Sequence, residues 1–461
     1  MSDTVSVSER QAKGEQLLAS AYAELREARP VSAAFHERAC RRLPGGTTRA
    51  RFWEPMPLYI EKGEGAYVTD LDELTYLDCN LGQGPMILGH KHPAVTAALR
   101  AQAPKGTHYG PPYESSLHLA ELIADSVPGA ERVAFVNSGT EATMGALRIA
   151  RKATGRRKIA KFEGGWHGSN EFTLYGFTSI SGDPAQADAN PDSRGLSSAS
   201  AADVVILPFN DPRAAQRIRA EGEELAGVIM EPVIGAGGCL PATPEFLQSV
   251  RDACDEVGAV LIFDEVISGY RVGPHSAAGE LGVTADVTTL GKIVGGGLPI
   301  GVICGQGELM SRTMWPSGPD GGRGVAAGGT FSGNPMTTTA GVAQLSELLG
   351  NPDTYPNLNR LGARLTQGIE EVFTRLGVTG HVTGMGSMVG VHLTPKRPTS
   401  RRDMTGANHL ASALLRIYLE LDGVVARGLT FLSTAHTTDD VDRIIDSHDK
   451  ALTRIQKEGC L

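Results

Sequence analysis

Cysteine is scarce in this sequence and is not arranged for disulfides or zinc. The 461 residues include six cysteines, and no two of them form a Cys-x-x-Cys pair. Isolated cysteines of this kind are typical of reduced thiols in a cytosolic protein. The spacing argues against both a disulfide framework and a structural zinc site.

Long hydrophobic runs and an excess of positive charge are also missing. No stretch approaches the roughly 20 apolar residues of a membrane span, and the N-terminus lacks the apolar core of a signal peptide. The formal net charge is −9, so the chain has no evident electrostatic attraction to nucleic acid or to an anionic membrane. We therefore expect a cytoplasmic protein whose partners are small molecules.

Aromatic residues make up only 5% of the chain, whereas glycine is in excess. The 57 glycines are about 12% of the residues, against a usual share of roughly 7%. They cluster in short loops beside apolar segments and form no repeat. Since glycine lets the backbone approach a ligand closely, these loops predict ligand-binding turns.

Apolar runs of strand length alternate with amphipathic runs of helix length from about residue 115 onwards. Strands that are apolar on both faces and separated by helices indicate a mostly parallel sheet covered on both sides. The predicted fold class is therefore α/β. The expected strands are residues 132–137, 203–209, 226–233, 259–266, 287–292 and 300–305.

The two ends of the chain differ from this middle part. Residues 58–79 have the pattern of a meander of short strands, and near the C-terminus helical patterns surround a strand pair at 381–393. We expect both ends to form one smaller α+β domain. The predicted division is 1–85 for the N-terminal part of this domain, 86–338 for the large α/β domain, and 339–461 for the C-terminal part.

A phosphate site is expected in the segment 135–142, FVNSGTEA, where a strand ends and a helix begins. The backbone N–H groups of a helix N-terminus, together with the hydroxyls of Ser138 and Thr140, suit a phosphate. Ser138 and Glu141 also have the spacing of a capping box. An ordinary helix cap is therefore the alternative interpretation.

Two acidic residues, Asp264 and Glu265, end a strongly apolar strand in the string LIFDEVISGYR. Open α/β sheets bind their ligands at the carboxyl ends of their strands. An acid at this place predicts a charge partner or a metal, and a helix cap after the strand is the alternative.

A lysine, Lys292, follows another apolar strand and precedes three consecutive glycines in the string TTLGKIVGGGLPIGV. The glycines let other groups crowd the amine, and a desolvated lysine becomes a nucleophile towards carbonyls. A structural lysine between strand and loop is the alternative.

These three features together are what pyridoxal phosphate requires. The lysine would bind its aldehyde, the helix N-terminus would hold its phosphate, and Asp264 would keep its ring nitrogen protonated. An ion pair at about 4 Å with an effective dielectric constant near 20 contributes about 4 kcal/mol, or roughly three pKa units. That is enough to keep the ring protonated, and the protonated ring is the electron sink for carbanion chemistry.

The sequence at this point resembles the class III (ω-type) aminotransferases of fold type I, in particular their glutamate-1-semialdehyde aminomutase branch. The resemblance covers almost the whole chain and rests on the strings NSGTEA, GGWHG, FDEV, TLGKIVGGGLPIG and GGTFSGNP. It implies that Lys292 is the Schiff-base lysine and proton shuttle, and that Asp264 pairs with the pyridinium nitrogen. Residues 86–338 would then be the domain that binds pyridoxal phosphate.

The same resemblance assigns the other residues around the cofactor. Trp166 would stack on one face of the ring with His167 beside it, and Val266 would press on the opposite face. Thr330 would reach the phosphate of the neighbouring subunit's cofactor, which implies a homodimer with shared active sites. The full set of cofactor-binding residues implied is Ser138, Gly139, Thr140, Trp166, His167, Glu231, Asp264, Val266, Lys292 and Thr330.

The substrate-binding positions depart from the mutase pattern. Gly428 or Leu429 stands where the mutases carry an acid, and Ala236 where they carry an asparagine. These positions resemble those of the β-amino acid (β-phenylalanine-type) aminotransferases instead. That likeness implies that Arg49 and Arg427 bind the substrate carboxylate, as guanidinium groups do with two parallel hydrogen bonds; solvated surface charge is the alternative for both.

The predicted function is therefore ping-pong transfer of an amino group from an amino acid, most specifically a β-amino acid, to a 2-oxo acid. The alternative is glutamate-1-semialdehyde 2,1-aminomutase or a related isomerase or racemase, in which no second oxo acid is consumed. A protein that binds the cofactor without catalysis is a third reading, which the presence of Lys292, Asp264 and Thr330 makes the weakest.

Overall fold

The computed structural model describes residues 7–48, 56–314 and 323–461 of the chain. Among these residues no helix is both long enough and apolar enough to cross a membrane. The α-helices are α1 (Val7–Glu27), α2 (Pro30–Cys40), α3 (Pro93–Gln102), α4 (Glu114–Ser126), α5 (Gly139–Thr154), α6 (Ser198–Ala201), α7 (Arg213–Glu221), α8 (Pro244–Val257), α9 (Ser276–Leu281), α10 (Gly307–Met314), α11 (Pro335–Gly350), α12 (Thr354–Leu376), α13 (His409–Leu421) and α14 (Thr438–Lys457).

Short 3₁₀ helices and four sheets complete the described part. The 3₁₀ helices are η1 (Pro44–Gly46), η3 (Ala103–Lys105), η4 (Gly222–Glu224), η5 (Lys292–Gly295) and η6 (Arg401–Met404). The largest sheet has nine strands, in the spatial order β4 (Arg132–Val136), β14 (Gly301–Gly305), β13 (Val287–Gly291), β12 (Val260–Asp264), β9 (Leu225–Met230), β5 (Lys158–Phe162), β8 (Val204–Leu207), β7 (Gln186–Ala187) and β6 (Gly182–Asp183).

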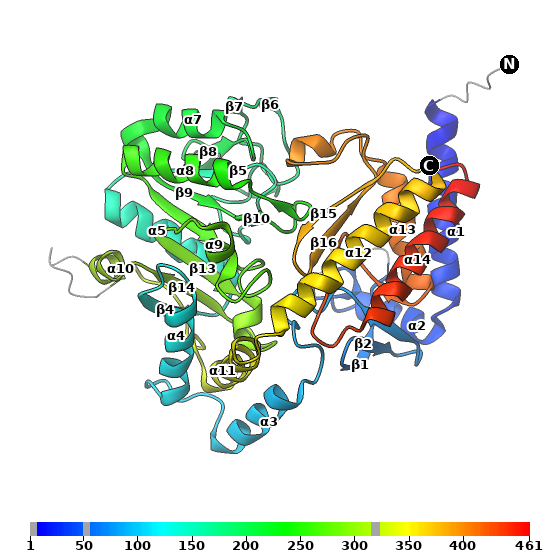
Figure 1. Ribbon diagram of the computed structural model, residues 1–461, viewed down its shortest axis with the longest axis horizontal. Helices are drawn as coiled ribbons and strands as arrows, with labels where there is room; N and C mark the ends of the chain where they lie inside the picture. The colour runs from blue at the N-terminus through cyan, green and yellow to red at the C-terminus, as the bar shows by residue number, and fades with distance from the viewer. Residues whose placement is uncertain (1–6, 49–55, 315–322) are drawn as a thin grey trace.

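Helices cover both faces of the nine-stranded sheet (Figure 1). Along β12, Val260 and Ile262 pack with α5, whereas Leu261 and Phe263 pack with α8 on the other face. Successive side chains of a strand point to opposite faces, so a strand between two helical layers must be apolar throughout. The predicted α/β fold is confirmed.

Strand direction is mostly as expected, and the exceptions are β14 and the short strand β7, which is antiparallel to its neighbours β8 and β6. The strand β12 runs parallel to β13 and β9, and β5 runs parallel to β9 and β8. The strand β14 is antiparallel to both of its neighbours, β13 and β4. Each of the six expected segments contains a strand, but β5 is an additional strand that the apolar pattern did not predict.

The expected meander is present and takes its fourth strand from the far end of the chain. Its sheet has the order β1 (Ile60–Glu64), β2 (Tyr67–Asp70), β3 (Thr75–Asp78) and β17 (Val424–Val425), with β17 parallel to β3. The remaining strands are β15 (His381–Met385), β16 (Met388–His392) and β18 (Leu429–Phe431), which form one sheet, and β10 (Val233–Ile234) with β11 (Leu240–Pro241), which form another.

Helices α12, α13 and α14 lie together with α1 beside these smaller sheets (Figure 1). One apolar cluster joins them, and it includes Leu25 near the N-terminus and Ile455 near the C-terminus. The two ends of the chain therefore share a core. The exact division at residues 85 and 338 stays a prediction.

Candidate active site

The helix α5 begins directly after β4, and Ser138 is its N-cap. The hydroxyl of Ser138 accepts a hydrogen bond from the N–H of Glu141 at 3.2 Å. The second half of the predicted capping box is wrong, because the Glu141 carboxylate accepts from the backbone N–H of Asn137 (2.8 Å) and from its side-chain amide (3.3 Å) instead. The two N–H donors of Asn137 therefore hold the Glu141 carboxylate at the residue before the N-cap, and not at the N-cap itself.

Asp264 is the last residue of β12 and is buried. One carboxylate oxygen accepts from the N–H of Val266 (3.1 Å) and from the hydroxyl of Thr289 (3.2 Å). The other lies 2.8 Å from Nδ1 of His167. A carboxylate can accept about four hydrogen bonds, so these three leave capacity for one further donor.

His167 is a neutral partner of Asp264. Burial lowers the pKa of His167 although the Asp264 carboxylate acts in the opposite direction. Since a carboxylate only accepts, the ring proton is assigned to Nδ1. Nε2 is buried without a hydrogen-bond partner among the described residues, and it lies against Gly165, where an added Cβ would approach it to 2.8 Å.

Both sides of the loop that carries Trp166 are held by buried charged residues. A Glu231 carboxylate oxygen accepts from the Trp166 N–H at 2.8 Å, and the other accepts from the Gly235 N–H at 3.0 Å. The amine of Lys161, on β5, donates to the carbonyl oxygens of Gly165 (3.0 Å) and Tyr175 (2.5 Å). The backbone of the loop is thus fixed immediately next to Trp166.

The two buried ionisable residues that hold this loop, Glu231 and Lys161, have displaced pKa values. Burial, reinforced by the nearby Asp264 carboxylate, raises the pKa of Glu231 to about 8, while Lys292 acts in the opposite direction. Burial lowers the pKa of Lys161 to about 8. Displaced pKa values of this kind are concentrated at functional sites.

Lys292 follows β13 and opens η5 in a left-handed conformation, with φ of 46°. This conformation costs a non-glycine residue on the order of 1 kcal/mol, and such strain is concentrated at functional sites. The side chain is half-buried, and a Cβ added at Gly84 would lie 3.7 Å from its Cδ. The side chain of Val266 contacts Gly291, which precedes Lys292, and Gly139 at the start of α5.

Arg271 is a fully buried residue beside the site that the sequence patterns did not single out. Its guanidinium donates to the carbonyl oxygens of Leu432 (2.7 Å) and Gly84 (2.5 Å) and to the hydroxyl of Ser387 (3.2 Å). It also lies 5.1 Å from the centre of the Phe431 ring. Burial lowers its pKa to about 10. Arg271 therefore joins three distant segments next to Lys292.

Replacing Arg271 by lysine is expected to lower the free energy of unfolding by about 2 kcal/mol, because one ammonium cannot reach both carbonyl groups as two guanidinium nitrogens do. Urea unfolding of the cofactor-free protein measures this effect without a contribution from cofactor loss. Arg364→Lys, on the exposed face of α12, serves as the control. If the midpoint and slope of urea unfolding are the same for Arg271→Lys as for the wild type, the stability of the protein does not depend on the paired hydrogen bonds of the guanidinium.

Lys161 and Arg271 had a signal in the sequence, although a weak one. Lys161 interrupts the apolar string KIAKF, and Arg271 follows the acidic motif by seven residues. A charged residue inside a buried strand requires polar partners. Those partners are backbone carbonyl groups here, and sequence patterns do not reveal where such groups lie.

Of the remaining predicted residues, the structure describes Thr330 and Arg427. Thr330 is exposed on the described chain. Arg427 donates to the carboxylate of Glu420 at 2.7 Å, and Glu420 also pairs with Arg29 at 2.6 Å. Arg427 is thus engaged in an ion-pair network within the chain. Arg49 lies outside the described residues.

The residues in the cluster fit pyridoxal phosphate. Asp264 has acceptor capacity left for a ring N–H, and Lys292 lies close enough to the buried Glu231 to oppose the rise of its pKa. Gly139 leaves room where an added Cβ would meet Val266 at 2.8 Å. The N-terminus of α5 provides N–H groups for a phosphate. The individual cofactor-binding roles stay predictions.

Comparisons with known proteins agree with this chemistry. The model of the class-III aminotransferase family matches residues 49–427. The glutamate-1-semialdehyde 2,1-aminomutase of Rhodopirellula baltica is 43% identical over 372 residues, which are 80% of this chain and 82% of that protein.

Two solved structures are similar over nearly the whole chain. The β-phenylalanine aminotransferase of Variovorax paradoxus has a TM-score of 0.86 and 33% identity, covering 96% of this chain and 98% of that one. A glutamate-1-semialdehyde aminomutase from Pseudomonas aeruginosa, solved in complex with PMP, has a TM-score of 0.87 and 26% identity, covering 96% and 98%. The chain belongs to the class III aminotransferases, enzymes that depend on pyridoxal phosphate.

Proposed function

We propose that this enzyme moves an amino group within one small amino carboxylate, as the glutamate-1-semialdehyde 2,1-aminomutases do. The observation that carries the proposal is the 43% identity to the Rhodopirellula baltica mutase over most of both chains. Arg427, one of the two arginines that the β-amino acid reading assigns to a substrate carboxylate, is paired with Glu420 within this chain.

The proposed roles are those that the family resemblance implies, and the site geometry is compatible with them. When bound, pyridoxal phosphate supplies an aldehyde for the amino group and an electron sink for the carbanion. Ser138, Gly139 and Thr140 would bind the phosphate, and Trp166 and Val266 would fix the two faces of the ring. Asp264 would accept the ring N–H, and the Lys292 amine would move protons at the carbon that bears nitrogen.

A β-amino acid transaminase is the second candidate. The absence of the mutase acid near Gly428 and Leu429 favours it, as does the structural likeness to the Variovorax paradoxus enzyme. In this reading Arg49 would bind the carboxylate, and an added 2-oxo acid would receive the nitrogen.

Nitrogen tracing decides between the two candidates. The enzyme is incubated with ¹⁵N-labelled glutamate-1-semialdehyde or β-phenylalanine, each with and without 2-oxoglutarate, and the products are identified by mass spectrometry. The mutase proposal predicts an isomerised product from the semialdehyde without any oxo acid. Transfer of ¹⁵N from β-phenylalanine to 2-oxoglutarate, with no isomerisation of the semialdehyde, would establish the transaminase instead.

We also propose that the functional unit is a homodimer with shared active sites. Thr330 is exposed, and the neighbouring Phe331 is 62% exposed. Phe331 borders a hollow of about 400 Å³ that also contains Asn137, next to the N-cap of α5. A second chain placed here would cover the apolar surface and bring its Thr330 towards the phosphate-binding end of the site.

A further inference from the structure

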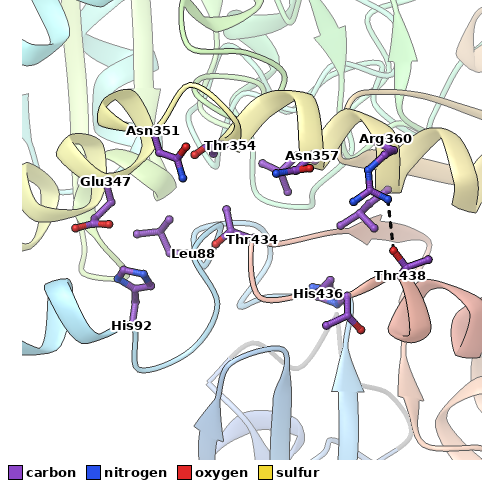
Figure 2. Close-up of a pocket in the computed structure, with 13 residues that line it drawn as sticks. Leu88, His92, Glu347, Asn351, Thr354, Asn357, Arg360, Thr434, His436 and Thr438 are labelled. Atoms are coloured by element: carbon purple, nitrogen blue, oxygen red, sulfur yellow. Dashed lines mark hydrogen bonds between the residues drawn. The ribbon is translucent and has the colours of Figure 1, made fainter.

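A cavity of about 350 Å³ lies between the α11–α12 corner and the loops around residues 88–92 and 434–438 (Figure 2). It shares no residue with the predicted cofactor site. Its volume is that of a small-metabolite pocket. The residues that line it are Leu88, His92, Glu347, Asn351, Thr354, Asn357, Leu358, Arg360, Leu361, Thr434, His436, Thr437 and Thr438.

One end of the cavity carries the positive charge of Arg360, an exposed residue of α12. Arg360 donates only to the Thr438 hydroxyl, at 3.4 Å, and no carboxylate of the described residues lies within ion-pair distance of it. Arg364, one turn further along α12, instead forms two hydrogen bonds with Asp442, at 2.6 and 2.7 Å. The Arg360 guanidinium thus keeps donors for a ligand.

Two histidines of the lining have buried ring nitrogens without a partner among the described residues, Nδ1 of His92 and Nε2 of His436. Nδ1 of His436 accepts from the Ser433 N–H at 3.1 Å, and burial lowers the pKa of His436 to about 4. The neutral ring therefore carries its proton on Nε2, a donor without an acceptor in a side chain that is only 4% exposed. Buried polar groups normally have partners, so this donor points to a missing acceptor.

The opposite end of the cavity is acidic. Figure 2 shows Glu347 and Arg360 at opposite ends, with Leu88 and Thr434 between them. They are the one carboxylate and the one guanidinium among the lining residues, so the formal charges of the lining sum to zero with the two signs separated. This distribution complements a zwitterion rather than a simple anion.

We propose that this cavity is a second binding site for an amino acid. Its carboxylate would contact Arg360, Thr438 and His436, and its ammonium group would contact Glu347. The amide side chains of Asn351 and Asn357 would supply further hydrogen bonds along the ligand.

The cavity is connected to Lys292 through α11. Gln344, one turn before Glu347, donates to the carbonyl oxygens of Ile293 (2.5 Å) and Pro85 (3.2 Å). Ile293 follows Lys292, and Pro85 follows Gly84. A ligand bound to Glu347 would therefore lie one turn of α11 from the residue that holds these two carbonyl groups. Binding does not depend on the proposed reaction, whereas a regulatory effect on Lys292 would rest on it.

Binding is tested on the holoenzyme with zwitterions that cannot react with the cofactor. The probes are N,N-dimethylglycine, 4-(dimethylamino)butanoate and 6-(dimethylamino)hexanoate, whose tertiary amines form no imine. Isothermal titration is performed on the wild type and on Arg360→Gln, Glu347→Gln and Arg364→Gln. Arg364→Gln is the matched control, because it removes the same charge one turn away and outside the cavity.

We expect at least one probe to bind saturably to the wild type and to the control with affinities within twofold of each other. Arg360→Gln and Glu347→Gln should each weaken binding at least tenfold. Absence of saturable binding by all three probes would refute the site. An equal loss of affinity in the Arg364→Gln control would mean that the probes respond to general surface charge and not to this cavity. Unchanged affinity in Glu347→Gln would refute the proposal that the cavity recognises the ammonium group of a zwitterion. Each result is independent of whether nitrogen tracing finds a mutase, a transaminase or neither.

Discussion

Lys292→Ala should remove the yellow colour of the purified enzyme and lower kcat at least about 10⁴-fold. The lysine is expected to supply both the nucleophile that binds the cofactor aldehyde and the base that moves the substrate proton, and a positioned base alone contributes about 10²–10⁴-fold. Lys292 lies beside Gly84 and acts electrostatically on the buried Glu231. Absorbance spectra and steady-state kinetics at saturating cofactor measure the two effects.

A second lysine controls for the loss of an amine as such. Lys158 lies at the start of β5, where its amine pairs with Glu221 and Glu224. Lys158→Ala should keep the colour and the wild-type kcat. Borohydride reduction followed by peptide mapping should label Lys292 in the wild type; active enzyme labelled elsewhere, or nowhere, would remove the basis of the site.

The layered fold was predictable because burial on two faces leaves a direct mark on the sequence. In β12, every residue from Val260 to Phe263 is apolar, and the structure buries alternate side chains against α5 and α8. Strand direction leaves no such mark. The strand β14 is as apolar as its neighbours but antiparallel to them, because its connection to β13 is a short turn after η5.

The strand β5 was missed for a related reason. Its lysines at 158 and 161 break the apolar run, yet Lys161 is fully buried, because two carbonyl oxygens accept from its amine. A buried cation of this kind is compatible with a strand only when tertiary structure supplies its partners. The apolar pattern alone therefore did not identify this segment as a strand.

In the candidate cofactor site, the proximity of residues at the ends of neighbouring strands was predictable from the sequence, whereas contacts between distant segments were not. Asp264 and Lys292 stand at the ends of adjacent parallel strands, so their proximity follows from topology. The contact of Asp264 with His167 joins residues 97 positions apart. The partner of Arg427, Glu420, lies at the end of a helix, and an ion pair across such a turn has no sequence signature.

Asp264→Asn tests the other half of the proposed chemistry and should lower kcat about 10³-fold. An ion pair between the carboxylate and the protonated ring is worth about 4 kcal/mol at 4 Å and an effective dielectric constant near 20, and each 1.36 kcal/mol changes the rate tenfold. The fold should survive, because the asparagine carbonyl can still accept from Val266 and Thr289. Single-turnover rates at saturating cofactor separate the chemical step from weaker cofactor binding.

The neighbouring acid provides the control that makes this result specific. Glu265 accepts from the N–H groups of Ala277 and Ala278 at the start of α9 and from the Ser268 hydroxyl, and burial raises its pKa to about 7. Because it is already partly protonated near neutral pH, Glu265→Gln should change kcat less than about threefold. Equal losses in the two variants would mean that the strand end needs both acids for folding. A loss confined to Asp264→Asn would mean that this carboxylate alone keeps the cofactor ring protonated, as the electron sink requires.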